Sequence, residues 1–237
     1  MNYYFITGSS SGIGKALVEE LLRHSKYTII GLSRTNTLVD KHFEHRKIDL
    51  SKLEDVNAFE FDPIEKNDRV VLINNAGTLG EISYIGQQSD ENIVVSSMVN
   101  FTSAAILMNK FIAAYQHHEG ERIIINITSG AADSPYDGWA SYCSAKAALN
   151  MFTQVIHEEQ LLTDNPVKVF AIAPGVVDTL MQDAIREVEQ ESFSRIDKFK
   201  ALKENDQLYK AKDVAKRIIE MTLDTKTIPS LISRIQL

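Results

Sequence analysis

Tyr142 and Lys146 stand four residues apart in the stretch WASYCSAK, with small residues around them. In an α-helix this spacing puts a phenol and an ammonium on one face, a single turn apart. A free phenol has a pKa of about 10, and a nearby positive charge favours the phenolate and lowers that pKa. The pair is therefore either part of an ordinary helix surface or a proton donor assisted by a lysine. The rest of the chain decides between these two interpretations.

A glycine-rich turn, TGSSSGIG, occupies residues 7–14 between the first expected strand and the first expected helix. Gly8 allows a tight turn, Gly12 lets backbone approach a pyrophosphate, and Gly14 permits close packing of helix on strand. The free N–H groups of the helix N-terminus would face the phosphates. The G-x-x-x-G-x-G spacing differs from the commoner G-x-G-x-x-G, and a flexible turn without a ligand is the alternative. The strand–turn–helix context predicts dinucleotide binding.

Ser33 and Arg34 end the second expected strand, in the stretch GLSRT. An NAD site usually has an acidic residue about 20 positions beyond the glycine turn to bind the ribose 2′-hydroxyl, whereas an arginine accommodates a 2′-phosphate. A guanidinium pairs with phosphate through two hydrogen bonds, and a serine adds another. A solvated surface arginine is the alternative. The pair predicts NADP(H) as the cofactor.

Short apolar runs alternate with longer helical patterns along most of the chain. Strands such as VVLI and IIINI are apolar throughout, which is typical of a parallel sheet covered by helices. This order predicts a single Rossmann-type, doubly wound α/β domain over residues 1–237, with helices on both faces. The charged segment 179–207 is expected to form a helical flap over a site. Strands are expected at 2–7, 27–33, 45–50, 69–75, 122–129 and 167–174, and helices at 12–24, from about 51, at 90–118, 139–163 and 208–223.

Composition excludes several classes of protein. A net charge of −7 over 237 residues argues against nucleic acid or an anionic membrane as partner. The single cysteine, Cys143, excludes an internal disulfide and cannot alone make a structural zinc site, so no metal is expected. No apolar run approaches the roughly 18 residues of a membrane span. A cytoplasmic enzyme acting on a small molecule is expected.

Seven motifs follow one another in a fixed order, and together they resemble the short-chain dehydrogenase/reductase superfamily over essentially the whole chain. Two longer runs, SGAADSPYDGWASYCSAKAALNMFTQ and APGVVDTLMQ, are similar to the sepiapterin reductase branch. They are closer still to the bacterial benzil reductases that form (S)-benzoin. The motifs are TGSSSGIG, Asp49-Leu50, NNAG at 74–77, Asn100, Ser129, Tyr142-x-x-x-Lys146 and Pro174-Gly175.

The resemblance implies a role for each catalytic candidate. Tyr142 would give a proton to a substrate carbonyl while NADPH delivers hydride to its carbon. Lys146 would lower the pKa of the phenol and hold the nicotinamide ribose. Ser129 would hydrogen-bond the carbonyl oxygen and stabilise the charge that develops there. Asn100 would hold a water that relays protons to the lysine.

The resemblance also extends the cofactor site beyond the glycine turn. Asp49 and Leu50 would contact adenine, although Asp49 is otherwise a helix N-cap. The NNAG and Pro-Gly segments would line the dinucleotide, although each is otherwise an ordinary turn. The expected cofactor-binding residues are Gly8, Ser10, Ser11, Gly12, Ile13, Gly14, Ser33, Arg34, Asp49, Leu50, Asn75, Ala76, Gly77, Tyr142, Lys146, Pro174, Gly175, Val177 and Thr179.

The expected substrate pocket is aromatic and apolar, with Ala131, Tyr136, Trp139 and Met181 in its walls. Such a lining suits a bulky ketone, in particular one carbonyl of an aromatic 1,2-diketone of the benzil type. One alternative is a sepiapterin or pteridine reductase, but those enzymes are expected to anchor the pterin through an acidic residue near the C-terminus, and no carboxylate side chain follows Asp224.

Two further alternatives concern the class of activity. A non-catalytic NADP(H)-sensing protein could share the fold, although such regulators typically lack the tyrosine or the lysine. An NAD-dependent alcohol oxidiser is the other. The resemblance also implies a homodimer or homotetramer assembled through the long helices near 90–118 and 139–163.

Overall fold

The computed structural model describes residues 1–36 and 38–237, and its centre is a seven-stranded sheet of order β3-β2-β1-β4-β5-β6-β9. Every neighbouring pair in this sheet is parallel. The chain starts in the middle of the sheet and winds outward first to one side and then to the other, which is the doubly wound pattern. The strands are β1 (Asn2–Thr7), β2 (Tyr27–Ser33), β3 (Phe43–Lys47), β4 (Arg69–Asn74), β5 (Arg122–Ile127), β6 (Lys168–Ala173) and β9 (Ile232–Arg234).

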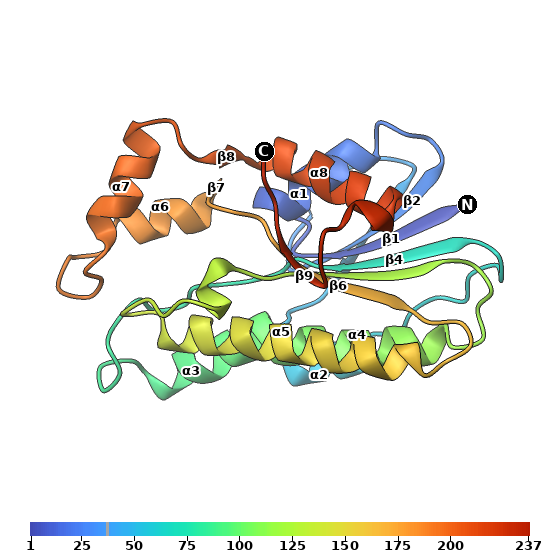
Figure 1. The fold of residues 1–237 in the computed structure, drawn as a ribbon, viewed down its shortest axis with the longest axis horizontal. Helices are drawn as coiled ribbons and strands as arrows, with labels where there is room; N and C mark the ends of the chain where they lie inside the picture. Colours follow the sequence, from blue (N-terminus) through green and yellow to red (C-terminus); the bar gives the residue numbers. More distant parts are fainter. Residues whose placement is uncertain (37) are drawn as a thin grey trace.

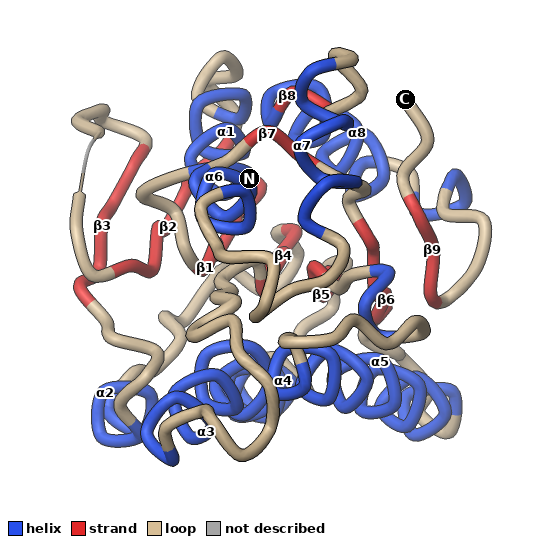
Figure 2. The backbone as a smooth tube through the Cα atoms, turned by 90° about the vertical axis from the view of Figure 1, so that its left-hand side faces the viewer, coloured by secondary structure: helices blue, strands red, loops and turns tan. Residues whose placement is uncertain are grey.

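Helices cover both faces of the sheet (Figure 1, Figure 2), so the predicted fold class is confirmed. One face carries α1 and α8, which pack against each other, and the opposite face carries α2, α3, α4 and α5. The central strands β4 and β5 are therefore buried on both sides, which explains their continuous apolar runs. The helices are α1 (Gly12–Leu21), α2 (Leu53–Ala58), α3 (Asp90–Ser97), α4 (Ser103–Ala114), α5 (Ala140–Leu161) and α8 (Ala211–Leu223).

The long helix expected over 90–118 is interrupted. A π-helical segment, Met98–Thr102, joins α3 to α4. Within it the Asn100 side chain donates to the Ser96 carbonyl at 2.9 Å, and that carbonyl is the acceptor of the Asn100 N–H in a regular α-helix. The polar side chain thus competes for an acceptor of the helical hydrogen-bond ladder, and the regular helix is interrupted at this point. The helix also ends early, at Ala114, because buried Arg122 donates to the Tyr115 carbonyl at 2.9 Å.

The third strand lies at Phe43–Lys47 instead of the expected 45–50. It pairs with β2 from Ile29 onward and stops before Asp49. There the Asp49 carboxylate accepts the backbone N–H of Ser51 at 3.0 Å, so a side-chain turn replaces the ladder.

The charged segment 179–207 contains two helices, α6 (Leu180–Arg186) and α7 (Ile196–Glu204). They project beyond the edge of the main sheet (Figure 1). A small parallel pair, β7 (Val177–Asp178) and β8 (Tyr209–Lys210), closes the base of this projection. Neither these two short strands nor β9 was expected from the sequence, since pieces of two or three residues carry no usable periodicity.

By length and composition alone, the helical run Asp90–Ala114 could cross a membrane, and core helices pass the same test. In the structure its apolar residues Leu107, Met108 and Phe111 are fully buried against the sheet and α5.

Candidate active site

The parallel strands bring five distant motifs to one edge of the sheet. The glycine turn follows β1, Ser33 ends β2, NNAG begins at the end of β4, Ser129 follows β5 and Pro174 follows β6. Ligands of open α/β sheets bind at such carboxyl ends, beside the point where the strand order reverses. A cleft of about 530 Å³ opens along this edge.

Most of the predicted cofactor-binding residues line this cleft. Those that do are Gly8, Ser10, Ser11, Gly12, Ile13, Ser33, Arg34, Asp49, Leu50, Asn75, Ala76, Gly77, Tyr142, Lys146, Pro174 and Thr179. The predicted residues Gly14, Gly175 and Val177 are not among those that line it. The same cleft is lined by Met181 of the predicted substrate pocket and by Leu79, Val95 and Val99, which sequence reasoning had not singled out.

The glycine turn has the geometry of a phosphate cradle. Gly8 and Gly12 adopt φ of +67° and +52°, a left-handed backbone that other residues rarely adopt. A Cβ on Gly14 would lie 2.1 Å from the Gly8 carbonyl oxygen, so α1 can approach the turn only with glycine there. Ser11 caps α1 without a side-chain hydrogen bond, so the first N–H groups of the helix are not used by their own cap. These residues fit the pyrophosphate of a dinucleotide.

NNAG is fastened to the glycine turn through Thr7. The Thr7 hydroxyl accepts the backbone N–H groups of Asn75 and Ala76 at 2.8 and 2.9 Å. The Asn75 side chain donates in turn to the Thr7 carbonyl at 3.0 Å. The Asn75 side chain and the Thr7 hydroxyl therefore hold two walls of the cleft together. The sequence places Thr7 in the glycine-turn motif but gives no signal of this role.

Ser33 and Arg34 have different environments at the end of β2. The Ser33 hydroxyl is buried, donates to the Thr35 carbonyl at 2.8 Å, accepts from Ser9 at 3.1 Å and lies 3.0 Å from Nε2 of His45. This hydroxyl is occupied inside the protein, which leaves Arg34 as the polar group that β2 offers to a ligand. His45 lies on an edge strand, and its sequence neighbours gave no signal of this contact.

Asp49 belongs to the same end of the cleft but caps no helix. Its carboxylate accepts the hydroxyl of Ser51 at 2.7 Å, and that hydrogen bond, with a smaller contribution from Arg34, lowers the pKa of Asp49. The N-cap of α2 is Lys52 instead.

Tyr142 and Lys146 are both buried, at 6% and 3% exposure, on the first turns of α5. Burial raises the pKa of Tyr142 to about 12, and hydrogen bonding with the Ser129 hydroxyl opposes the rise. Burial lowers the pKa of Lys146 to about 8. The Lys146 ammonium donates to the Ile127 carbonyl at 2.9 Å and lies 5.8 Å from the centre of the Tyr142 ring. Burial is the largest influence on the pKa of this phenol in the structure, and the lowering of that pKa by Lys146 together with an oxidised nicotinamide stays a prediction.

A raised pKa keeps the Tyr142 phenol protonated at neutral pH, which is the state that a proton donor needs. Ser129 is placed to hold the acceptor of that proton. Its oxygen accepts the Ala131 N–H at 3.1 Å, so its O–H can donate to a carbonyl oxygen.

Asn100 faces Lys146 across Gly77. A Cβ on Gly77 would lie 3.1 Å from Oδ1 of Asn100 and 3.6 Å from Nζ of Lys146. The amide of Asn100 clamps the loop after β4, donating to the Thr78 carbonyl at 2.8 Å and accepting the Thr78 N–H at 3.0 Å. The structure therefore brings Asn100 to the site and gives it a clear positioning contact.

Three predicted pocket residues lie behind the cleft in an aromatic cluster. Trp139 stacks between Tyr136 and Phe193, with ring centres 4.9 and 5.0 Å apart, and meets the Tyr142 ring edge-on at 6.0 Å. Ala131 is buried in the same cluster. Because Phe193 lies between α6 and α7 in the chain, the cluster joins the projecting segment to α5. The aromatic character of Tyr136 and Trp139 alone could not reveal that their rings pack inward.

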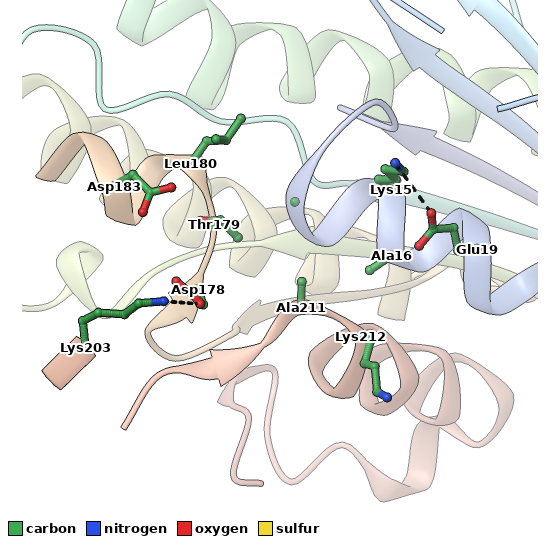
Figure 3. A pocket seen from close by; sticks show the side chains of 11 residues that line it. Lys15, Ala16, Glu19, Asp178, Thr179, Leu180, Asp183, Lys203, Ala211 and Lys212 are labelled. Carbon is green, nitrogen blue, oxygen red and sulfur yellow. Dashed lines mark hydrogen bonds and ion pairs between the residues drawn. The ribbon is translucent and has the colours of Figure 1, made fainter. Parts of the chain in front are cut away.

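A second hollow, of about 560 Å³, shares Gly12, Thr179 and Leu180 with the first cleft and is drawn in Figure 3. Ion pairs line it, between Lys15 and Glu19 at 3.7 Å and between Lys203 and Asp178 at 2.6 Å. None of the predicted catalytic residues lines this hollow, whereas Tyr142 and Lys146 line the first cleft.

Comparison with known proteins agrees with this geometry. Residues 2–190 match the family described as short chain dehydrogenase. A benzil reductase ((S)-benzoin forming) of Bacillus cereus is 37% identical over 97% of this chain and 96% of that protein. Sepiapterin reductase of Bos taurus is 34% identical over 67% of this chain and 58% of that protein. The crystal structure of a short chain dehydrogenase/reductase from Saccharomyces cerevisiae superposes with a TM-score of 0.82 at 25% identity, over 99% of this chain and 96% of that one.

Proposed function

This chain belongs to the short chain dehydrogenase family and is an oxidoreductase that acts on CH–OH or C=O groups, and we propose that it uses NADPH to reduce one carbonyl of a bulky 1,2-diketone. The observation that carries the proposal is the buried Tyr142 phenol, held between the Ser129 hydroxyl and the Lys146 turn of α5 at the edge of the dinucleotide cleft.

The chemistry assigned to the residues is general acid catalysis. When bound in the cleft, a reduced nicotinamide would supply the hydride that the carbonyl carbon accepts, and it would be oxidised in doing so. Tyr142 donates its proton to the carbonyl oxygen as the C=O π bond breaks, and the product is an alcohol. Ser129 donates a hydrogen bond to the oxygen while negative charge develops there. A positioned general acid contributes roughly 10²- to 10⁴-fold in rate.

Lys146 acts on the cofactor side of the phenol. Its ammonium lies within the cleft and is fixed by the Ile127 carbonyl. From there it can hold the ribose hydroxyls of a bound nicotinamide nucleoside. Asn100 supports the position of the Lys146 ammonium by fixing the loop that lies between the Asn100 and Lys146 side chains.

NADPH is favoured over NADH by Arg34. Arg34 directly follows β2, where an NAD site would have a carboxylate, and its side chain lines the cleft. Asp49 shares that end of the cleft, but Ser51 holds its carboxylate. Arg34 is therefore the residue that supports recognition of a 2′-phosphate.

A bulky diketone is supported by the similarity to benzil reductase and by the apolar residues beside Tyr142. Leu79, Val95, Val99 and Met181 line the cleft, and Leu79 and Met181 pack in one cluster with Tyr142. The test is a substrate panel: NADPH oxidation by the purified protein is measured with benzil, isatin-type diketones, sepiapterin and simple aldehydes. We expect the diketones to give the highest kcat/KM. Simple aldehydes outpacing every diketone would contradict the proposal.

Reduction of a pteridine is the second candidate, and similarity to sepiapterin reductases supports it. Against it stands the C-terminal segment, which carries no acidic side chain after Asp224. Sepiapterin in the same panel separates the two. A non-catalytic sensing role is less well supported, since Ser129, Tyr142 and Lys146 are all present and clustered.

Assembly into a homodimer or homotetramer remains a proposal. It is supported by apolar side chains exposed on the outer faces of α3 and α5, including Val94 at 61%, Met151 at 60% and Val155 at 46%. Sedimentation velocity of the purified protein tests it, and a monomer at micromolar concentration would contradict it.

A further inference from the structure

Arg234 ends β9, the last strand of the sheet, and stands at the same edge as the active site. It pairs in register with Ala173, and the N–H of Ile235 donates to the Ala173 carbonyl at 2.9 Å. Ala173 immediately precedes Pro174, which lines the cleft. The C-terminal strand therefore delivers an arginine to the carboxyl end of β6.

The side chain of Arg234 extends toward the residue that follows the carbonyl-binding serine. A Cβ on Gly130 would lie 3.4 Å from Nη2 and 3.8 Å from Cζ of Arg234. Paired residues of parallel strands face the same side of the sheet, so Arg234 shares the face of Ala173. Ile235 points to the opposite face, into the core under α1 and α8. Because Gly130 has no side chain, the Arg234 guanidinium can approach the backbone next to Ser129.

The charge of Arg234 is not neutralised within the protein. Over residues 1–36 and 38–237 it makes no ion pair and no hydrogen bond, and its side chain is exposed. Two other arginines near the site do have contacts. Arg186 pairs with Asp183, and Arg195 lies 4.7 Å above the Tyr136 ring. Within the same described residues, Asp133, three residues beyond Gly130, forms no ion pair with Arg234.

We propose that Arg234 forms a subsite for an anionic group, a carboxylate in particular, on the carbonyl compound that this enzyme reduces. The inference rests on the proposed function and narrows its substrate class from bulky diketones to carbonyl compounds that also carry a negative charge. A guanidinium meets a carboxylate through two parallel hydrogen bonds, which fixes orientation as well as charge. Here it would fix the substrate relative to Ser129 and Tyr142.

The experiment compares one ketone in two charge states. Phenylglyoxylate is an anion, and its methyl ester is the neutral counterpart with the same reacting carbonyl. kcat/KM is measured for both with NADPH in the wild type, Arg234→Gln, Arg234→Lys and Lys226→Gln. Lys226 is an exposed lysine of the turn before β9, at the other end of the C-terminal segment, so its replacement matches the change in net charge.

We expect Arg234→Gln to lower kcat/KM for the anion about tenfold more than for the ester, mainly through KM. Arg234→Lys should restore part of the loss, and Lys226→Gln should leave the anion-to-ester ratio unchanged. Added salt should weaken the preference for the anion in the wild type but not in Arg234→Gln.

Equal losses for anion and ester in Arg234→Gln, or an unchanged ratio, would overturn the inference. If the wild type does not turn over phenylglyoxylate, its inhibition constant against benzil replaces kcat/KM in the same four proteins, and absence of inhibition also overturns the inference. Benzil separates failure of this subsite from failure of the proposed function. If benzil is reduced and Arg234→Gln leaves the anion-to-ester ratio of kcat/KM unchanged, only the anionic subsite is overturned. If benzil is not reduced, the proposed function is overturned.

Discussion

Lys146→Met should make the protein more stable at neutral pH while it abolishes the reductase activity. Burial lowers the pKa of Lys146 from 10.5 to about 8, a fall of about 2.5. Each pKa unit corresponds to about 1.4 kcal/mol, so below pH 8 the buried ammonium costs the folded state roughly 3 kcal/mol. Methionine has a similar shape and no charge. Losing the hydrogen bond to the Ile127 carbonyl costs about 1 kcal/mol, which leaves a net gain of about 2 kcal/mol.

The pH dependence gives the sign of the effect. Below pH 8 the lysine is charged in both the folded and the unfolded state, and the full cost applies. Between about pH 8 and 10.5 the unfolded state still holds the proton while the folded state has lost it, so wild-type stability rises with pH. The variant lacks this rise. The difference of about 2 kcal/mol at pH 7 should therefore nearly vanish by about pH 9.5.

Urea unfolding followed by circular dichroism at pH 7 and pH 9.5 measures both values. Lys216→Met, at an exposed lysine of α8, is the matched control and should show no pH-dependent difference from the wild type. The reasoning is refuted if Lys146→Met is less stable than the wild type at pH 7. It is also refuted if the difference is the same at both pH values.

Three further changes probe the rest of the site. Arg34→Asp should lower kcat/KM with NADPH by about 100-fold, because it removes charge-assisted hydrogen bonds to the 2′-phosphate and adds a carboxylate that repels it. Steady-state kinetics with NADPH and NADH measure the cofactor preference. No shift toward NADH would count against the assignment of Arg34 to the 2′-phosphate. Gly14→Ala should weaken NADPH binding at least about tenfold in a fluorescence titration, because the added Cβ would lie 2.1 Å from the Gly8 carbonyl oxygen. Unchanged affinity would show that the glycine turn does not hold the pyrophosphate. Trp139→Ala should destabilise the protein by about 3–5 kcal/mol and speed amide hydrogen exchange in α6 and α7, because Trp139 stacks on Phe193, which lies between these two helices in the chain. Unaltered exchange would contradict the coupling of Trp139 to α6 and α7.

The parallel, doubly wound character of the main sheet and six of its seven strands could be predicted, because they depend on patterns within the sequence. Continuous apolar runs such as RVVLIN and RIIINI indicate strands buried on both faces, and their alternation with helices requires parallel pairing. Parallel pairing in turn brings the strand ends together, so Gly8 and Ser129 had to lie at one edge.

What sequence reasoning missed depends on where polar side chains find partners across the fold. The π-helical break follows from the Asn100 amide, which bonds Ser96 on one side and Thr78 on the other. The buried Ser33 hydroxyl depends on His45 in a neighbouring strand. Neither contact leaves a trace in the periodicity of the chain.

The pKa values of the catalytic pair were also outside what spacing can show. The i, i+4 arrangement of Tyr142 and Lys146 was sufficient to place both groups on one helix face. It carried no information on depth, and burial turned out to be the larger influence on both groups. A similar limit applied to Trp139, whose aromatic character suggested a pocket wall while its neighbours placed it in the cluster behind.

The central claim is that Tyr142 gives the proton in an NADPH-dependent carbonyl reduction, and Tyr142→Phe tests it most directly. The measurement is single-turnover oxidation of NADPH by benzil, paired with a fluorescence titration of NADPH binding. We predict a loss of at least about 10²-fold in the rate with NADPH affinity within about twofold of the wild type, because only the reacting hydroxyl is removed. A rate within about threefold of the wild type, with the same NADPH affinity, would contradict the claim.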